Sequence, residues 1–266
     1  MGYQVIKRLF IIIVLLFWSC DEVVLEQDNP LDPGNPDFDP PVVTFTSGPQ
    51  DETVGTSEVT FEWEGNELIS AYRTKFNNDS WTGWVTNTSV TLQYLDEGSY
   101  SFSIQGRYST EDTSAVVTSN FGVDAVQGPA LMFYPRANFS SVGSNVTFQV
   151  HAEDVNDLTA VQFNVTFDPS KLEIVSITQG SFFLEFGESI FSFDFDNQTG
   201  SFSVVTAALG GDQPSGMGTG PLLEVVLTVK ETGTSYLEFD GTELFRDPDN
   251  NNISISEAVN GVVISE

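Results

Sequence analysis

The stretch AVQFNVTFDPSKLEIVSITQG, residues 160–180, alternates apolar and polar side chains. Only an extended chain places every second side chain on one face, so this spacing predicts a strand. The turn residues Asp168-Pro-Ser170 follow, and the apolar residues from Leu172 onward predict a second strand. The apolar face of the first strand belongs in a core. Its polar face, which carries Gln162 and Asn164, meets either water or a partner.

The composition is that of an acidic protein rich in phenylalanine. The 266 residues are enough for two domains of roughly 100 to 150 residues each. Nine Lys and Arg stand against 38 Asp and Glu, which gives a net charge of −29. Nucleic acid is therefore a poor partner, because phosphate binding needs clustered cations. A solvated surface, basic partners or divalent cations all suit such acidity. The 22 Phe among few charged residues favour antiparallel sandwiches.

The N-terminal segment MGYQVIKRLFIIIVLLFWSC predicts export. Lys7 and Arg8 precede an apolar run, Leu9–Trp18, that is too short to cross a bilayer and fits a signal peptide. Cys20, the only cysteine, follows directly. The segment resembles the bacterial lipobox, which implies removal of residues 1–19 and a lipid on Cys20. The alternatives are an ordinary signal peptide or an uncleaved anchor with an incidental cysteine, and the choice of membrane stays open.

An acidic, proline-rich linker is expected over residues 20–41. Five prolines lie in this segment, and each proline removes a backbone donor and restrains the residue before it. The composition predicts an extended, unpacked stalk of polyproline II type between the anchor and the first domain.

Short alternating runs separated by turns fill residues 42–125 and predict an all-β sandwich. The sequence LDEGSY, residues 95–100, resembles the Leu-x-x-Gly-x-Tyr corner of fibronectin type III and immunoglobulin-like modules. That resemblance implies that the Tyr100 hydroxyl bonds the loop before its strand and that Trp63 is a core residue.

Two more tryptophans lie in NNDSWTGW, residues 77–84. Trp81 and Trp84 are candidates for a sugar-binding platform, because exposed indoles stack on pyranose rings. In the alternative interpretation both side chains fold back over the small core of the module.

Residues 128–266 carry a second resemblance, which rests on the order of four motifs. They are a VG turn before the strand NVTF, the stretch VQFNVTFDPSKL, the strand GSFSVVTAAL followed by Gly-Gly, and a short last strand GVVI. Together they resemble the cohesin domain. The resemblance implies a nine-stranded jelly-roll sandwich that binds a dockerin domain on another protein.

The cohesin resemblance also implies contact residues on one sheet face. These are Gln162 with its flanking residues Ala160 and Asn164; Val205, Ala207 and Ala208 on a later strand; and Leu244 and Phe245 in a late loop. Cohesins favour Asp or Asn where Gln162 stands and an acidic residue near Ala208. This departure leaves open a different dockerin type, or no dockerin at all.

Catalytic chemistry is not indicated by the sequence. The single histidine, His151, is expected to point outward beside Glu153, and no nucleophile–histidine set, phosphate loop or Cys/His metal spacing appears. We expect no cofactor. Asp247, Asp249 and Asn251 follow the spacing of a calcium loop, but Asn252 and Ala258 stand at its glycine and last carboxylate positions. A turn, or weak calcium binding, is expected there.

The sequence thus predicts an exported, lipid-anchored, non-catalytic protein with two β-sandwich domains. An immunoglobulin-like module at 42–125 acts as a spacer, and the cohesin-like domain at 128–266 binds a dockerin-bearing or other surface protein, as in an assembly that degrades polysaccharide. In the alternative hypothesis the second sandwich is a carbohydrate-binding module that holds glycan directly.

Overall fold

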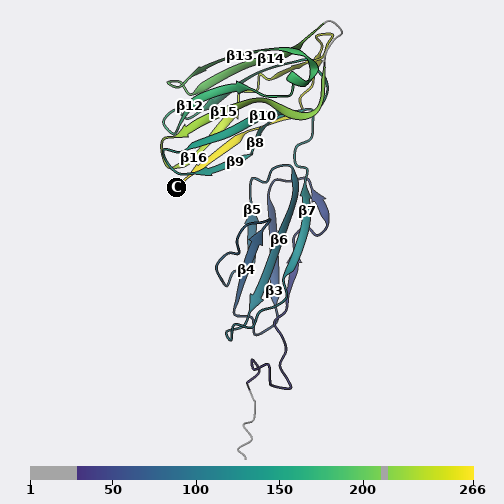
Figure 1. Ribbon diagram of the computed structural model, residues 1–266, viewed down its shortest axis with the longest axis vertical. Helices are drawn as coiled ribbons and strands as arrows, with labels where there is room; N and C mark the ends of the chain where they lie inside the picture. Colours follow the sequence, from purple (N-terminus) through teal and green to yellow (C-terminus); the bar gives the residue numbers. More distant parts are fainter. Residues whose placement is uncertain (1–28, 211–214) are drawn as a thin grey trace, which may run out of the picture.

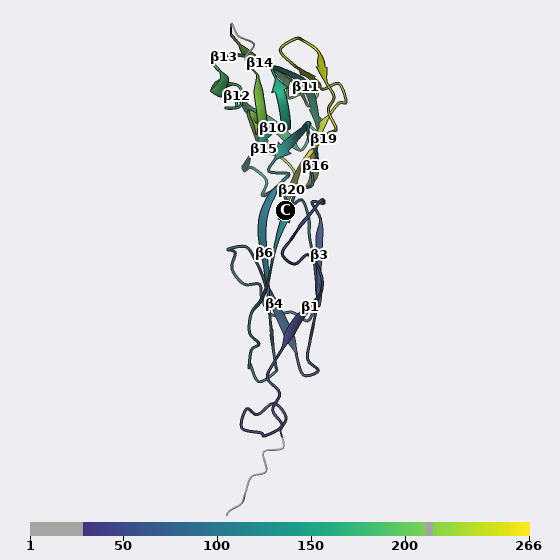
Figure 2. The same cartoon turned by 90° about the vertical axis from the view of Figure 1, so that its right-hand side faces the viewer.

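The computed structural model describes residues 29–210 and 215–266, and nearly all of its regular structure is β-strand. The strands form two groups, β1–β7 and β8–β20, which follow each other along the long axis of the molecule (Figures 1 and 2). One short 3-10 helix, η1 (Leu184–Phe186), lies in the second group. The expected all-β fold is confirmed. The signal peptide and Cys20 lie outside the described residues.

The first group is a sandwich of two small sheets. Its strands are β1 (Val43–Ser47), β2 (Glu52–Val54), β3 (Val59–Gly65), β4 (Ala71–Phe76), β5 (Ser89–Leu92), β6 (Gly98–Arg107) and β7 (Val117–Val123). One sheet has the order β1-β3-β5 and the other β2-β7-β6-β4. Alternate residues of β3 and β6 enter the space between the sheets, where Phe61 stacks on Phe102 at 4.5 Å. The core therefore follows directly from the period of two.

The corner before β6 has the predicted contacts. The Tyr100 hydroxyl donates a hydrogen bond to the backbone carbonyl of Asp96 at 2.8 Å. Trp63 is buried and packs edge-on against Tyr72. Both expectations for these two side chains are confirmed.

The proline-rich segment differs from the expected extended stalk over residues 29–38. Three successive turns form there, each begun by an Asn or Asp before a proline: Asn29, Asp32 and Asn35. Each of these side chains accepts a hydrogen bond from the backbone two residues on, which is the Asx turn. Asx-Pro pairs thus favour turns where composition alone suggested polyproline II. Phe38 then packs edge-on against Tyr108 of the first sandwich.

The second group is a larger sandwich. Its strands are β8 (Ala130–Tyr134), β9 (Ala137–Ser140), β10 (Asn145–Leu158), β11 (Ala160–Phe167), β12 (Leu172–Gln179), β13 (Glu188–Asp196), β14 (Ser201–Leu209), β15 (Gly216–Val229), β16 (Gly233–Phe239), β17 (Leu244–Arg246), β18 (Asn252–Ile253), β19 (Glu257–Val259) and β20 (Gly261–Ser265). A five-stranded sheet has the order β12-β15-β10-β8-β19. An eight-stranded sheet has the order β13-β14-β11-β16-β20-β9, with β17 beside β11 and β18 beside β17.

The cohesin resemblance implied nine strands for this group, whereas its described residues form thirteen strand segments. Part of the difference arises at Pro135, which has no N–H for a ladder and lies between β8 and β9. β8 joins the five-stranded sheet and β9 the eight-stranded one, so one run of chain contributes to both layers. The short segments β17, β18 and β19, of two or three residues each, add to the number of strand segments.

The opening stretch becomes β11 and β12, as its alternation predicted. Val161, Phe163, Val165 and Phe167 are buried in the core between the two sheets. Gln162 and Thr166 are exposed on the opposite side of β11.

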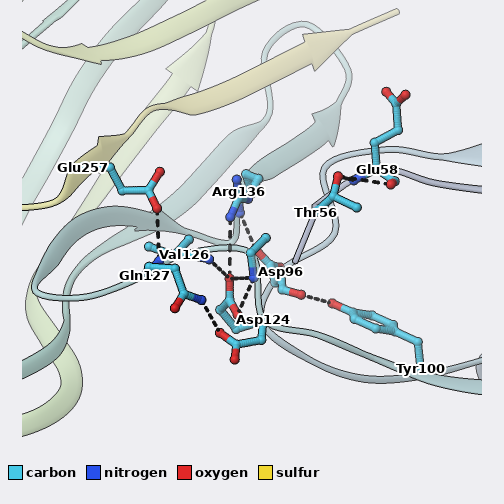
Figure 3. A network of polar contacts seen from close by, with 11 residues as sticks. Thr56, Glu58, Asp96, Tyr100, Asp124, Val126, Gln127, Arg136 and Glu257 are labelled. Atoms are coloured by element: carbon cyan, nitrogen blue, oxygen red, sulfur yellow. Dashed lines mark hydrogen bonds and ion pairs between the residues drawn. The ribbon is translucent and has the colours of Figure 1, made fainter. Parts of the chain in front are cut away.

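Side-chain carboxylates accept hydrogen bonds from the backbone near the connection between the two groups of strands (Figure 3). Glu97 accepts hydrogen bonds from the backbone N–H groups of Ala125 and Val126, both at 3.0 Å, and pairs with Arg136 at 3.7 Å. The Asp96 carboxylate accepts a hydrogen bond from the backbone N–H of Arg136 at 2.6 Å. Burial raises the pKa of the Glu97 carboxyl, against the opposing effect of these donors. The corner of the first sandwich is thereby tied to the first strands of the second.

Candidate partner-binding face

Six of the eight predicted contact residues point to the outer face of the eight-stranded sheet, where β13, β14, β11 and β17 lie side by side. One of the six, Ala207, is only 9% exposed. Val205 pairs with Gln162 on one side and with Ser192 on the other. Gln162 in turn pairs with Leu244. Directly opposed residues of antiparallel strands point to the same face, so these four side chains form one row across the sheet.

A second row lies beside the first. Ala160 pairs with Ala207 and Arg246, and Ala207 pairs with Ile190. Residues that are distant in sequence are thus neighbours, with Arg246 as a cation at one end of the row.

The third row is polar. Asn164 pairs with Ser203, which pairs with Asp194. The Asn164 side-chain amide donates to Asp240 Oδ2 at 2.9 Å. Bonds from the Thr242 hydroxyl and from Asn164 hold the pKa of the Asp240 carboxyl below its usual value. This end of the face therefore stays anionic at neutral pH.

Two predicted contact residues do not lie on this face. Ala208 is 4% exposed and Phe245 is not exposed at all. Ala208 follows the outward position Ala207, and Phe245 pairs with the core residue Val161, so alternation turns both inward. They are corrected to core residues.

Two exposed apolar residues of the face were missed. Ile190, Leu209 and the predicted Val205 are 44%, 41% and 40% exposed. The only sequence signal for Ile190 is the alternation of ESIFSFDFD, which marks a strand but not its neighbours. The outer face is thus apolar at the Ile190 and Leu209 end and acidic toward Asp194 and Asp240.

Comparison with known families decides what kind of domain carries this face. The family model described as the cohesin domain matches residues 136–264. These residues form a cohesin domain. The matched stretch is shorter than the predicted 128–266 and leaves the first sandwich outside it.

Solved structures give likenesses at low identity. A non-cellulosomal cohesin from the archaeon Archaeoglobus fulgidus is 20% identical, covers 52% of this chain and 90% of its own, and has a TM-score of 0.43. The sixth cohesin of scaffoldin B from Acetivibrio cellulolyticus, solved with a mutant dockerin, is 21% identical over 53% of this chain and 100% of its own, with a TM-score of 0.47. A chain from a type I cohesin–dockerin complex of Clostridium thermocellum is 14% identical, covers 52% of this chain and 92% of its own, and has a TM-score of 0.44. No curated protein matches the sequence.

The predicted calcium ligands of the cohesin domain form a turn. Asn251 donates to Asp247 from its backbone N–H at 2.7 Å and from its side-chain amide at 3.0 Å. The Asn251 amide thus presents N–H, and not oxygen, to the carboxylate. Within residues 29–210 and 215–266, no cluster of three or more His, Cys, Asp or Glu side chains could hold a metal ion.

His151 of the cohesin domain is partly buried. Its ring lies 5.1 Å from the Tyr134 ring and its Nε2 lies 2.9 Å from Gln149 Oε1. Burial lowers the pKa of His151 to about 4, so the ring is neutral at pH 7. A structural role fits these contacts.

Trp81 and Trp84, in the first sandwich, are not an open platform. The Arg73 guanidinium lies 4.7 Å from the Trp81 ring and 4.8 Å from the Trp84 ring. Arg107 also lies 4.6 Å from Trp84. Because cations already stack on the indoles, a pyranose ring would have to displace them. Sugar stacking on both rings is therefore corrected to cation stacking.

Within the described part of the chain, no helix is long and apolar enough to span a membrane.

Proposed function

We propose that this protein is a non-catalytic envelope lipoprotein whose cohesin domain binds a dockerin-type partner through the outer face of β13, β14, β11 and β17. The observation that supports the proposal is the pairing of Gln162 with Val205 and Leu244, because it joins three of the predicted contact positions, together with Ser192, in one row across a sheet. Other cohesins have been solved in complex with dockerins, and we take the partner class from them.

The chemistry of the face suits a protein partner. A flat antiparallel sheet offers a broad contact surface, and exposed valine, isoleucine and leucine side chains gain free energy when a partner covers them. Gln162 lies between the apolar and polar rows and can both donate and accept a hydrogen bond. A partner with an apolar strip and adjacent hydrogen-bond donors is complementary to this arrangement.

The membrane anchor belongs to the same proposal. Lipid on Cys20 would attach the chain, and the segment after it and the first sandwich would act as a spacer. The first described residues, drawn in purple, lie at the opposite end of the long axis from the cohesin domain (Figures 1 and 2). This arrangement supports presentation of the binding face away from the anchor.

Direct glycan binding is a second candidate, because one observation favours it. The Phe193 and Phe195 rings on the edge strand β13 are nearly parallel, at 11°, and both are more than one third exposed. Aromatic side chains in such a row can contact sugar rings. Under this alternative, glycan retention would depend on Phe193 and Phe195 and not on Gln162.

The deciding experiment is capture of secreted and surface proteins of the source organism on the immobilised full chain. Mass spectrometry should identify a dockerin-bearing protein, and calorimetry should measure its affinity. Gln162→Arg places a long cation in the middle of the row and should abolish capture. The matched control Thr178→Arg places the same side chain at an exposed position of β12, on the other sheet, and should not. Capture that survives Gln162→Arg, or that both variants abolish, contradicts the proposal.

A further inference from the structure

The outer face of the sheet β2-β7-β6-β4 concentrates positive charge on an acidic protein. Nine Lys and Arg occur in the sequence, and two of them, Lys7 and Arg8, lie outside the described residues. Of the remaining seven, three lie together here: Arg73 and Lys75 on β4, and Arg107 at the end of β6. Three of the seven described cations thus share one sheet face of a chain whose net charge is −29.

The three cations alternate with two indole rings. Lys75 Nζ lies 5.7 Å from Trp81, and Arg73 lies between Trp81 and Trp84. Arg107 contacts the Trp84 ring from β6. Arg73 and Lys75 are two residues apart and share a face, and Arg107 pairs with Ala71, so the order along β4 is Lys75, Trp81, Arg73, Trp84, Arg107. We call this set the cation–indole ladder.

The backbone and one amide hold the ladder in place. Val85 and Tyr72 exchange two backbone hydrogen bonds of 2.8 and 2.7 Å, so the tryptophan segment pairs with the free edge of β4. Arg73 donates from Nε and Nη2 to Gln105 Oε1 at 3.0 and 2.6 Å. The guanidinium is therefore positioned before any ligand arrives, which lowers the entropic cost of binding.

The charge of the ladder is poorly compensated within the protein. Glu111 lies 4.0 Å from Arg107, but its side chain is 84% exposed, and such pairs contribute little. The other described ion pair joins Arg136 and Glu97. In the described chain, neither Arg73 nor Lys75 takes part in an ion pair.

A polar hollow of about 780 Å³ continues the same face. Its lining includes Asn77, Asn78, Ser99, Ser101 and Asn120, with Asp51 and Glu52 also in the lining. Ser99 and Ser101 occupy alternate positions of β6, as Gln105 and Arg107 do, so hydroxyls and cations lie along one side of one strand. The face thus has a hydroxyl and amide end and a cationic end.

We propose that this face binds an acidic polysaccharide, a sugar chain that carries carboxylates or sulfates at intervals. Cations separated by an indole ring each meet successive acid groups, and amide and hydroxyl side chains bond sugar hydroxyls. Asp51 and Glu52 accept hydrogen bonds from hydroxyls and repel acid groups toward the ladder. Nucleic acid, with a charge on every phosphate, fits poorly to three cations on a protein of this net charge.

The test is affinity electrophoresis of the full chain in gels that contain polygalacturonate, with neutral hydroxyethylcellulose as the comparison. Polygalacturonate should retard the protein, and added salt should weaken the retardation. Lys75→Gln/Arg107→Gln should weaken the affinity roughly tenfold, since two charge contacts are lost. The matched control Lys171→Gln/Lys230→Gln removes the same charge from the cohesin domain, where both side chains only bond backbone carbonyls. It should leave retardation unchanged.

Four outcomes overturn the proposal: no retardation, equal retardation by the neutral polymer, equal loss in both double variants, or equal retardation by poly-glutamate. Thermal unfolding shows whether the ladder variant is folded. If it is not, Lys75→Gln alone, at the end of the ladder, must still weaken the affinity severalfold. Gln162→Arg should not alter retardation, which separates this site from the cohesin face.

Discussion

At the scale of single residues, alternation decides which way a side chain points, and neighbouring side chains decide how much of it is exposed. His151 points to the outer side of β10, as expected, because its neighbours Val150 and Ala152 are buried. Its ring is nevertheless partly covered by Tyr134 and Gln149 on that side. Alternation sets the direction of a side chain, whereas neighbouring side chains on the same sheet face determine how much of it they cover. The consequence is a histidine whose pKa is about 4.

This lowered pKa predicts a loss of stability on mild acidification. As pH falls through the ordinary histidine value near 6.5, the unfolded chain binds a proton while folded His151 stays neutral until about pH 4. Unfolding thus becomes easier between these values. Because His151 is partly exposed, we discount the full effect. Between pH 7 and pH 5 the free energy of unfolding of the wild type should fall by on the order of 1 kcal/mol more than that of His151→Gln. Urea denaturation of both proteins at the two pH values measures this difference. Equal losses of stability in the two proteins would show that His151 is not the cause of the pH dependence.

At the scale of elements, the pairing of strands determines the candidate site. Local sequence predicts β11 and β14 separately, but only the sheet shows that Gln162 faces Val205 and Leu244. The same pairing turns Ala208 and Phe245 into the core and adds Ile190 and Leu209 to the face. Strand pairing is set by long-range packing and loop geometry, which a local pattern does not contain.

The row across the sheet predicts the effect of a charge at Val205. Val205→Asp should weaken binding of the captured partner at least tenfold, because an apolar contact is replaced by a carboxylate that must lose water. The free energy of unfolding should change little, since the side chain is already 40% exposed. Calorimetry for affinity and urea denaturation for stability provide the two readouts. Val175→Asp, on the exposed side of β12, is the control, and a similar loss of affinity there would remove the row from the binding site.

At the scale of the whole molecule, the junction sets how the cohesin domain is presented. Glu97 and Arg136 form an ion pair with 21% and 15% of their side chains exposed, and Glu97 also accepts two backbone bonds from the connecting segment. The backbone N–H of Gln127 donates a hydrogen bond to the side-chain carboxylate of Glu257, in the second sandwich, at 3.0 Å (Figure 3). Such partly buried contacts resist bending better than an open linker does.

Removal of the junction charge should therefore loosen the molecule. Glu97→Gln keeps a hydrogen-bond acceptor but loses the charge facing Arg136, and we expect a broader distribution of interatomic distances in small-angle X-ray scattering. Melting of each sandwich should change by only a few degrees. Glu111→Gln removes the exposed partner of Arg107 and serves as the control. Identical scattering from wild type and Glu97→Gln would mean that the ion pair does not fix the angle.

The sequence by itself determined the all-β class, the strands with their buried faces, the tyrosine corner and the cohesin resemblance, because each depends on neighbours along the chain or on ordered motifs. Only the tertiary structure decided the composition of the outer face, the turns of residues 29–38, the cation–indole ladder and the junction. Those features join residues that lie far apart in sequence or compete for the same local hydrogen bonds. Arg107 reaches Trp84, and Glu97 reaches Ala125, only after the sheets have closed their cores.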